Sequence, residues 1–264
     1  GNASSLHLLG EEARRGVEES RVIIAKALGA KHNEIIFTSS GTEANNAVLK
    51  GLFFQNYPDK DHIITTKIEH DCILNTCKWL EKQGAKLTYL DVDKEGFIDL
   101  KQLEDSITAK TLVVSVIHGN NEIGTIQNLK EMGGICKQKS VYFHTDACQS
   151  FTKVPINVDK QNLDFVTVNS HKIHGPKGVG ALYIRKGIKI NPEWLKLLYE
   201  YNGRIWDLES DIRKGKDGEL GLEEIGRRTI EIRGWNKKRV GVKNKVVEET
   251  GLGFKDVKMN HASA

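Results

Sequence analysis

The feature that most constrains the fold is a series of apolar, β-rich runs that alternate with segments of helical character. Seven runs predict strands, over residues 34–39, 62–66, 86–92, 111–118, 141–147, 163–171 and 180–186. Several are apolar at consecutive positions, as expected of strands that helices cover on both faces. The segments Glu11 to Leu28, Thr42 to Phe54 and Cys72 to Gln83 predict helices around the strands. This alternation predicts an α/β fold, a three-layer sandwich with a mainly parallel sheet.

Size and charge restrict the class of protein. With 264 residues, 39% of them hydrophobic, the chain can bury one large core and a small second module. The 39 basic and 35 acidic residues are interspersed and leave a net charge of only +4, which argues against a nucleic-acid or membrane surface. No apolar run approaches the roughly 18 residues of a membrane span, and the first residues lack a signal-peptide layout. We expect neither nucleic acid nor membrane as a partner.

The cysteines indicate a reducing compartment. The four are Cys72, Cys77, Cys136 and Cys148, with no CxxC pair and no disulfide-scaffold density. We interpret them as reduced thiols in the cytoplasm or an organelle matrix. The sequence starts without a methionine, which fits a fragment or a processed product.

The strand pattern stops near residue 192, and two helices are predicted beyond it. Apolar side chains repeat at steps of four and three over residues 194–212, the stripe of an amphipathic helix. A second helix, dense in charge, is predicted over residues 222–249, so that the two form a helical hairpin. Residues 251–264 read as a loose tail. We therefore predict two parts, residues 1–192 and residues 193–264.

Polar clusters follow four of the predicted strands. They are Ser39 to Thr42, His118 to Glu122, Asp146, and His171 with Lys172. In open α/β sheets, ligands bind beyond the carboxyl ends of the strands. Four clusters at one edge of the sheet predict a site there.

The first cluster, in "TSSGTEANN", predicts a phosphate site. After a strand, Ser40, Gly41 and Thr42 open a helix, where free backbone N–H groups and the helix dipole favour an anion. An ordinary Ser/Thr helix cap with Glu43 in the first turn explains the same residues. From this segment alone, the cap is the simpler interpretation.

Asp146, in "VYFHTDACQS", ends a buried strand without a basic neighbour in sequence. A carboxylate in such a place is costly unless it finds a cation or hydrogen-bond donors. The protonated ring nitrogen of a cofactor would be such a partner, and a helix cap at the strand exit is the alternative. Gln149, one helical turn further on, would address the same ligand.

Lys172, in "NSHKIHGPKG", is a candidate for covalent chemistry. A free lysine, with a pKa of about 10.4, is a poor nucleophile at neutral pH, and burial or nearby positive charge favours the reactive amine. His171, His174 and Lys177 are possible neighbours, and the turn at residues 175–176 would hold the lysine outward. The alternative is an exposed loop lysine, the commonest fate of any lysine.

Together these three elements match the requirements of one cofactor. A phosphate cradle, an acid for a ring nitrogen and a lysine that forms a Schiff base are the grip that pyridoxal 5'-phosphate needs. The carboxylate keeps the ring protonated as an electron sink. No metal site is expected.

Residues 1–192 resemble the cysteine desulfurases of the class V aminotransferase group, pyridoxal-phosphate enzymes of fold type I. Several spaced motifs in one order make this resemblance far more specific than any single motif. The motifs are "GNASSLHLLG", "EIIFTSSGTEANNAVLKG", "KIEHDCILNTC", "HGNNEIGTIQ", "FHTDACQSFTKVPINV" and "HKIHGPKGVGALYIRK". The last 70 or so residues do not resemble a known family.

The resemblance implies a role for each matched residue. Lys172 would form the Schiff base, Asp146 would pair with the pyridine nitrogen, and Gln149 would bond the phenolic oxygen. His70, in "EHDC", would stack on the ring and act as an acid/base group, although a helix-start histidine is the alternative from sequence alone. Asn121, in "NNEIG", would lie near the cofactor hydroxyl and the substrate carboxylate.

The phosphate would be held at the opposite end of the cofactor. The resemblance assigns it to the side chains of Thr42 and His171 and to the amides of Gly41 and Thr42. A serine often stands where this chain has Asn169, so a phosphate contact at that position is in doubt.

Two departures from the family bear on activity. The segment before the "GN" motif is absent, and so is the small domain with its catalytic cysteine loop and substrate-binding arginine. The cysteines do not match that loop, since Cys148 lies in the cofactor-binding turn and Cys72 and Cys77 follow His70. We interpret them as packing residues. The chain is therefore expected to bind the cofactor and to desulfurate weakly or not at all.

Three functions remain open. The first is a cysteine desulfurase-like enzyme that converts L-cysteine to L-alanine, passes sulfur to an acceptor protein and forms a homodimer, as the family does. The second is a non-catalytic cofactor-binding or dimerisation module that uses the hairpin as a contact surface. The third is a pyridoxal-phosphate aminotransferase, which would leave "HGNNEIG" and "EHDC" without a purpose.

Overall fold

The computed structural model describes residues 2–5, 7–190 and 217–250. It separates into two compact units, residues 13–190 and the remainder of the chain. The first unit contains the whole sheet and is described first. The division into domains at residue 192 stays a prediction.

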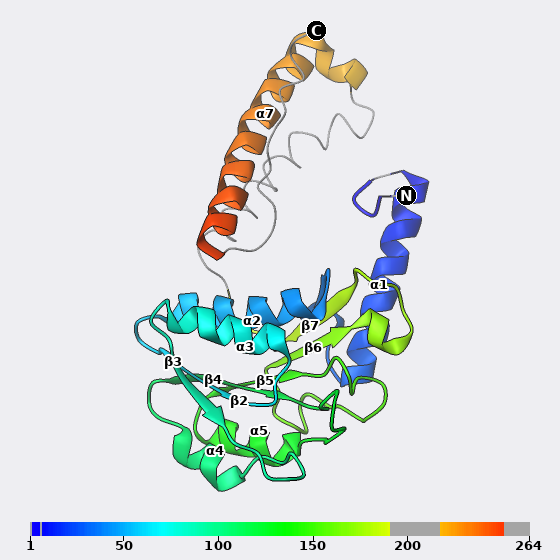
Figure 1. Cartoon of the computed structure of the whole chain (residues 1–264). Helices are drawn as coiled ribbons and strands as arrows, with labels where there is room; N and C mark the ends of the chain where they lie inside the picture. Colours follow the sequence, from blue (N-terminus) through cyan, green and yellow to red (C-terminus); the bar gives the residue numbers. More distant parts are fainter. Residues whose placement is uncertain (1, 6, 191–216, 251–264) are drawn as a thin grey trace. The chain divides into compact units, whose positions relative to one another are not determined.

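A seven-stranded sheet forms the centre of residues 13–190 (Figure 1). Its spatial order is β1-β7-β6-β5-β4-β2-β3. All strands run parallel except β7, which lies antiparallel between β1 and β6. The strands are β1 (Ile35–Thr38), β2 (His62–Thr66), β3 (Lys86–Leu90), β4 (Thr111–Ile117), β5 (Tyr142–Asp146), β6 (Phe165–Asn169) and β7 (Gly180–Ile184). The predicted α/β fold with a mainly parallel sheet is confirmed.

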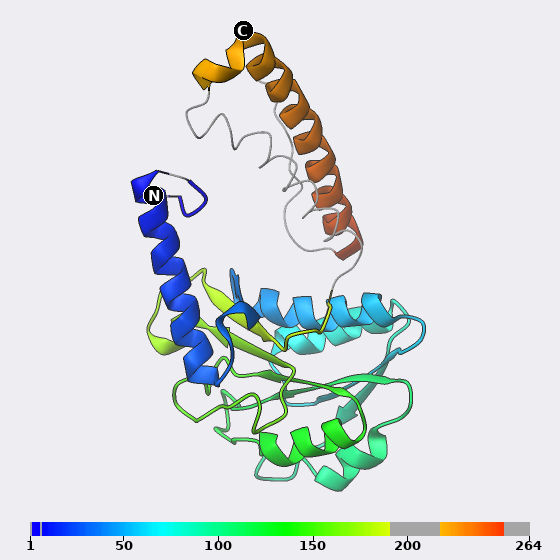
Figure 2. The same ribbon diagram turned by 180° about the vertical axis from the view of Figure 1, so that it is seen from behind.

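Helices cover both faces of the sheet (Figures 1 and 2). The helices α2 and α3 lie on one face, and α4 and α5 on the other. The bounds are α1 (Leu8–Leu28), α2 (Gly41–Asn56), α3 (Asp71–Glu81), α4 (Leu100–Ser106) and α5 (Leu129–Gln138), with the 3-10 helices η1 (His32–Glu34) and η2 (Ser170–Ile173). The three helices expected before residue 84 are present.

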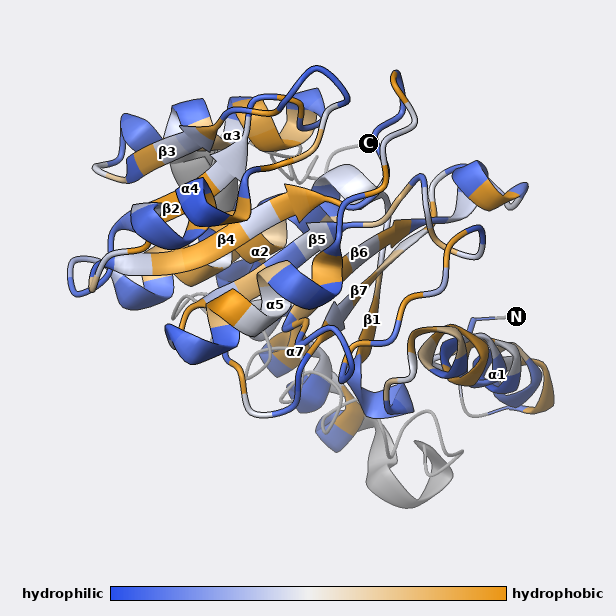
Figure 3. Ribbon diagram, turned by 90° about the horizontal axis from the view of Figure 1, so that it is seen from below, coloured by the Kyte–Doolittle hydropathy of each residue, from blue (hydrophilic) through white to orange (hydrophobic). Residues whose placement is uncertain are grey.

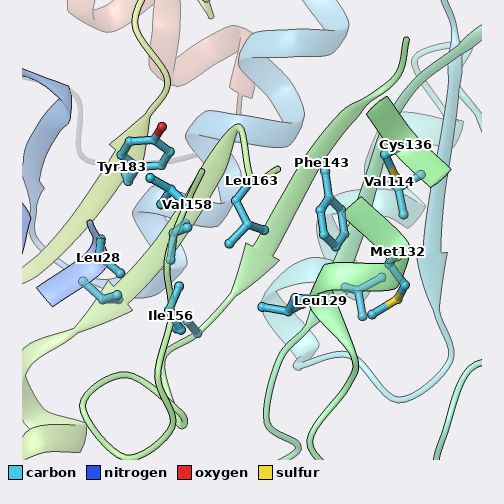
Figure 4. Close-up of a cluster of buried hydrophobic side chains, with 14 of the residues drawn as sticks. Leu28, Val114, Leu129, Met132, Cys136, Phe143, Ile156, Val158, Leu163 and Tyr183 are labelled. Carbon is cyan, nitrogen blue, oxygen red and sulfur yellow. The ribbon is translucent and has the colours of Figure 1, made fainter. Parts of the chain in front are cut away.

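The core lies in two apolar layers, one on each side of the sheet. All residues of β4 are buried, and the strand is largely orange in the hydropathy colouring of Figure 3. Because successive side chains of a strand point to opposite faces, Val113 packs with α2 and α3 while Val114 packs on the side of α5. Figure 4 shows that second layer, where Phe143 lies beside Met132.

The described residues of the second unit are the start of the chain, with the first residues of α1, and the helix α7 (Asp217–Thr250). Glu224 bonds Arg227 and Arg228, and Arg227 also pairs with Glu231, so this stretch is crossed by ion pairs one turn apart. A helix was expected over most of this range. The expected helix over residues 194–212 and the tail over residues 251–264 lie outside the described residues. Among the described helices, none is long and apolar enough to cross a membrane.

Candidate active site

The carboxyl ends of β1, β4, β5 and β6 and the start of α3 surround a cavity of about 160 Å³. Every residue predicted for the site lines this cavity, whichever motif it comes from. These residues are Gly41, Thr42, His70, Asn121, Asp146, Gln149, Asn169, His171 and Lys172. Parallel strands bring segments that are far apart in sequence to a common edge, which is why the motifs meet.

The start of α2 approaches the sheet edge closely. Ser40 is the helix cap, since its hydroxyl accepts a hydrogen bond from the N–H of Glu43 at 3.1 Å. The Glu43 carboxylate reaches back and accepts from the N–H of Ser39 at 2.6 Å. A Cβ on Gly41 would lie 2.5 Å from Sγ of Cys148, so a glycine lets the helix start sit against the strand ends. The turn that caps α2 therefore also forms one wall of the cavity.

Asp146 lies at the floor of the cavity and is only 4% exposed. Its Oδ1 accepts from the N–H of Cys148 at 2.9 Å, and its Oδ2 accepts from Nδ2 of Asn45 at 2.6 Å. No ion pair of the described residues includes it. Residues 148–153 form turns and not an α-helix, so Asp146 is no helix cap. Gln149 reaches the cavity from this turn.

Lys172 belongs to η2, directly after β6. The helix ends at His174, whose φ of 63° turns the chain away. Lys172 is exposed, so the protein itself does not bury the amine. His171 lines the cavity beside it, whereas His174 and Lys177, the other proposed neighbours, do not. Lys172 and Asp146 line one cavity and lie on the same side of the sheet edge.

His70 and Asn121 complete the rim. His70 is the cap of α3, where its Nδ1 accepts from the N–H of Cys72 at 3.1 Å, and it also lines the cavity, while its role at a cofactor ring stays a prediction. Asn121 lies on the loop after β4. Its neighbour Asn120 fixes this loop, because Asn120 donates to the carbonyl of Ile68 at 2.9 Å and accepts from the N–H of Glu122 at 2.8 Å.

A layer of buried polar groups lies beneath the cavity. His118 bonds the Ser150 hydroxyl, and His144 lies between the Ser115 and Thr167 hydroxyls. Burial lowers the pKa of each of these two histidines to about 4, so both are neutral at pH 7. The structure thus keeps hydrogen bonds here without adding positive charge.

Glu69 is the second buried carboxyl group near Asp146. Its Oε1 accepts from the Thr66 hydroxyl at 2.7 Å and from the N–H of Ile117 at 2.8 Å, while Oε2 has no partner among the described residues. Burial raises the pKa of Glu69 to about 8, and the charge of Asp146 adds to this shift. Glu69 is therefore mostly a neutral acid at pH 7.

Sequence reasoning missed Asn45 and Glu69, although both lie inside quoted motifs. Asn45 follows Gly41 by one helical turn and so faces the same way, a spacing that was available as a signal. Glu69 precedes His70 in "EHDC", and nothing in the sequence marks it as buried.

The thiols near the site are not activated. Cys72 and Cys148 line the cavity, and burial raises the pKa of both thiols. Burial also raises the pKa of Cys77 and Cys136 to about 12. A thiol is a nucleophile only as the thiolate, so these cysteines are poorly suited to accept sulfur.

The profile of the aminotransferase class-V family matches residues 1–197. The chain belongs to the class-V aminotransferase family. It is 51% identical over 192 residues to cysteine desulfurase IscS of Dictyoglomus turgidum, a match that covers 73% of this chain and 49% of that protein. It is 53% identical over 185 residues to cysteine desulfurase IscS of Rickettsia typhi, with 69% and 45% covered. The chain spans about half the length of the curated relatives it matches.

Solved structures give the same assignment. SspA in complex with cysteine superposes with a TM-score of 0.69 at 43% identity, over 70% of this chain and 54% of that one. A NifS-like protein gives a TM-score of 0.70 at 42% identity, over 73% and 53%. DndA from Streptomyces lividans gives 0.65 at 27% identity, over 89% and 82%. The resemblance to cysteine desulfurases read from the motifs is thus confirmed.

Proposed function

We propose that this chain provides the pyridoxal-phosphate-binding core of a cysteine desulfurase, which converts L-cysteine to L-alanine and transfers the sulfur to an acceptor. The observation that supports this best is that nine residues from separate motifs line one cavity. The sequence identity of about 50% to cysteine desulfurases supports the proposal independently.

The residues at the cavity fit pyridoxal phosphate. Asp146 is a buried acid without an ion-pair partner in the described ranges, and a protonated ring nitrogen would match it. The first turn of α2 offers backbone N–H groups for a phosphate. Lys172 has an exposed amine at the same cavity. Backbone N–H donors for the phosphate, a carboxylate for the ring nitrogen and an amine for the aldehyde are the three features that this cofactor requires.

Each residue has a separate task in the proposed reaction. When bound, pyridoxal phosphate supplies an aldehyde for amines and an electron sink for the substrate's Cα. Lys172 would contribute the amine that holds the aldehyde, and Asp146 would pair with the ring nitrogen. Thr42, His171 and the α2 amides would hold the phosphate. Asn169 lies at the same edge of the sheet. A serine often stands at this position in the family, and an asparagine in its place leaves the phosphate contact there unassigned.

The remaining side chains orient the substrate and move protons. Gln149 would bond the phenolic oxygen of the cofactor, Asn121 would orient the substrate carboxylate, and His70 would exchange a proton at the rim. In the net reaction the C–S bond of L-cysteine breaks, an acceptor thiol gains that sulfur as a persulfide, and a proton replaces it on carbon. The cavity thiols are protonated, so the acceptor thiol is expected from another protein or segment.

The proposal extends to assembly and compartment. The chain forms a homodimer and meets a sulfur-acceptor protein. It works in a reducing compartment, the cytoplasm or an organelle matrix, which its free cysteines support.

Reconstitution tests this function. We expect the purified chain to turn yellow with pyridoxal phosphate, and Lys172→Ala to remove the absorption band. Lys177→Ala is the matched control, because Lys177 lies on the same loop but outside the cavity. Added L-cysteine should yield little alanine or sulfide from this chain alone. Robust turnover would refute the expectation of weak activity. A protein that stays colourless would refute the proposed cofactor site.

A non-catalytic module is the second candidate. The raised pKa values of the cavity thiols favour it. A colourless protein that still forms dimers would support this alternative.

A further inference from the structure

Asn45 is a buried amide whose position packing does not explain. It lies on α2, is 1% exposed, and its Nδ2 contacts Oδ2 of Asp146 at 2.6 Å and Sγ of Cys72 at 3.2 Å. Its Oδ1 has no partner among the described residues. A buried amide with an unpaired oxygen costs free energy. The hydrogen bond from Asn45 to Asp146 therefore gives a functional reason for this residue.

That bond fixes the acid at the floor of the cavity. A short bond from an N–H donor to a carboxylate is charge-assisted and stronger than a neutral one. The other oxygen of Asp146 is held by the N–H of Cys148 at 2.9 Å. With both oxygens bonded, the carboxylate has one orientation. Hydrogen bonds to the charged form also favour that form over the neutral acid.

The surroundings of Asp146 oppose its charge, which makes this support necessary. The region contains Glu69, Cys72 and Cys148, and each has its pKa raised in part by the Asp146 charge. His144 is neutral and so offers no cation. Lys172 is the cation in the same cavity, but no ion pair of the described residues joins it to Asp146, so Asn45 is a direct donor among buried groups that carry no positive charge.

Asn46, the next residue, shows what a purely structural asparagine looks like here. Its Nδ2 donates to the carbonyl of Thr42 at 2.9 Å, and its Oδ1 accepts from the Thr76 hydroxyl at 2.8 Å. Asn46 therefore ties α2 to α3 and is bonded at both ends. Asn45 does not duplicate this role.

We propose that Asn45 is a positioning residue for Asp146, which holds the carboxylate in its anionic form and in one orientation and thereby determines how firmly the cofactor ring nitrogen keeps its proton. The inference rests on the proposed function, because it needs pyridoxal phosphate in the cavity. Without Asn45, the Asp146 carboxylate would bind the proton that it shares with the ring nitrogen more tightly. The ring nitrogen would then hold that proton less tightly.

The contact itself is tested without cofactor. In the protein free of pyridoxal phosphate, the side-chain amide signal of Asn45 in a ¹H–¹⁵N spectrum should lie downfield and exchange slowly with water. Asp146→Asn should move it upfield and speed its exchange. An Asn45 signal unchanged by that substitution would overturn the proposal.

The role is tested with cofactor labelled with ¹⁵N at the ring nitrogen. In Asn45→Leu, the signal should move towards neutral pyridine, and the proton affinity of the ring nitrogen should fall by about tenfold, as for the loss of one hydrogen bond to a charged group. Asn46→Leu is the control, because it removes bonds from the same turn but should leave the signal unchanged. Asn45→Ala replaces Asn45→Leu if the latter does not fold.

The two hypotheses fail differently. If the unmodified chain takes up no pyridoxal phosphate, the proposed function is refuted and the role of Asn45 with it. If it takes up the cofactor and Asn45→Leu gives the unmodified signal, the role of Asn45 alone is refuted.

Discussion

Two buried carboxyl groups, Asp146 and Glu69, lie close together and have different partners. Asp146 accepts hydrogen bonds at both oxygens, whereas Glu69 is bonded only at Oε1. Burial raises the pKa of Glu69 and favours its neutral acid, whereas N–H donors occupy both oxygens of Asp146, so the surroundings of the two carboxyl groups are divided. This division keeps a second negative charge away from the floor of the cavity.

Glu69→Gln tests that division. The pKa of Glu69 is raised to about 8 from 4.5, so the folded state binds the proton more tightly and stability falls as pH rises from 4.5 through 8. At about 1.4 kcal/mol per pH unit, the loss reaches about 5 kcal/mol. Glutamine removes it, so the variant should match the unmodified protein near pH 5 and exceed it near pH 8.5 in urea unfolding. Glu122→Gln, at an exposed loop position, is the control, and parallel curves for Glu69→Gln would contradict the assignment.

At the scale of elements, the strands were predictable from sequence and two helices were not. Every expected strand is present because buried parallel strands are marked by consecutive apolar residues. Helix α4 was missed because it has only 7 residues, too few to show a period. Helix α5 was missed because Gly133 and Gly134 lie inside it, and glycine disfavours helices.

The site was predictable for a related reason. Its residues follow strand ends or open helices, positions that sequence patterns mark. Glu69 was not predictable as a member, because its burial comes from tertiary packing and not from the local pattern, whereas the spacing between Gly41 and Asn45 was a usable signal. Lys172 is exposed, so burial, one of the two conditions considered for activating its amine, is not met by the protein itself.

The two glycines of α5 should respond oppositely to alanine. A Cβ on Gly133 would lie 1.9 Å from the backbone oxygen of Gln161, whereas one on Gly134 would meet nothing within 4 Å. Alanine improves helix propensity at both positions by up to about 1 kcal/mol. Gly134→Ala should therefore stabilise the protein by that amount, and Gly133→Ala should destabilise it by about 1–3 kcal/mol through overpacking. Thermal unfolding measures both, and equal effects would refute the close approach of α5 to the loop at Gln161.

At the scale of the molecule, the buried titratable groups act on stability in opposite directions. His118 and His144 have pKa values lowered from 6.5 to about 4, so between these pH values the unfolded chain binds protons that the folded chain does not bind. Their contribution is complete above pH 6.5 and is lost as pH falls towards 4. Glu69 does the reverse, since its contribution is lost as pH rises from 4.5 through 8. The uncharged polar groups buried beneath the cavity thus limit the pH range over which the fold is stable.

These opposing slopes predict a stability maximum near pH 6.5. Between pH 4.5 and 6.5 the buried histidines, whose pKa values are lowered, outweigh Glu69, and from pH 6.5 to about 8 Glu69 dominates, so stability should fall by about 1 kcal/mol by pH 5 and by about as much by pH 8. Urea unfolding across pH 5 to 8.5 measures the curve. His118→Asn should reduce the slope on the acid side only, whereas Glu69→Gln should flatten the alkaline side and steepen the acid side, with His32→Asn, an exposed histidine, as control. A flat profile, or a His118→Asn variant that alters both sides equally, would show that these buried groups do not govern the stability of the fold.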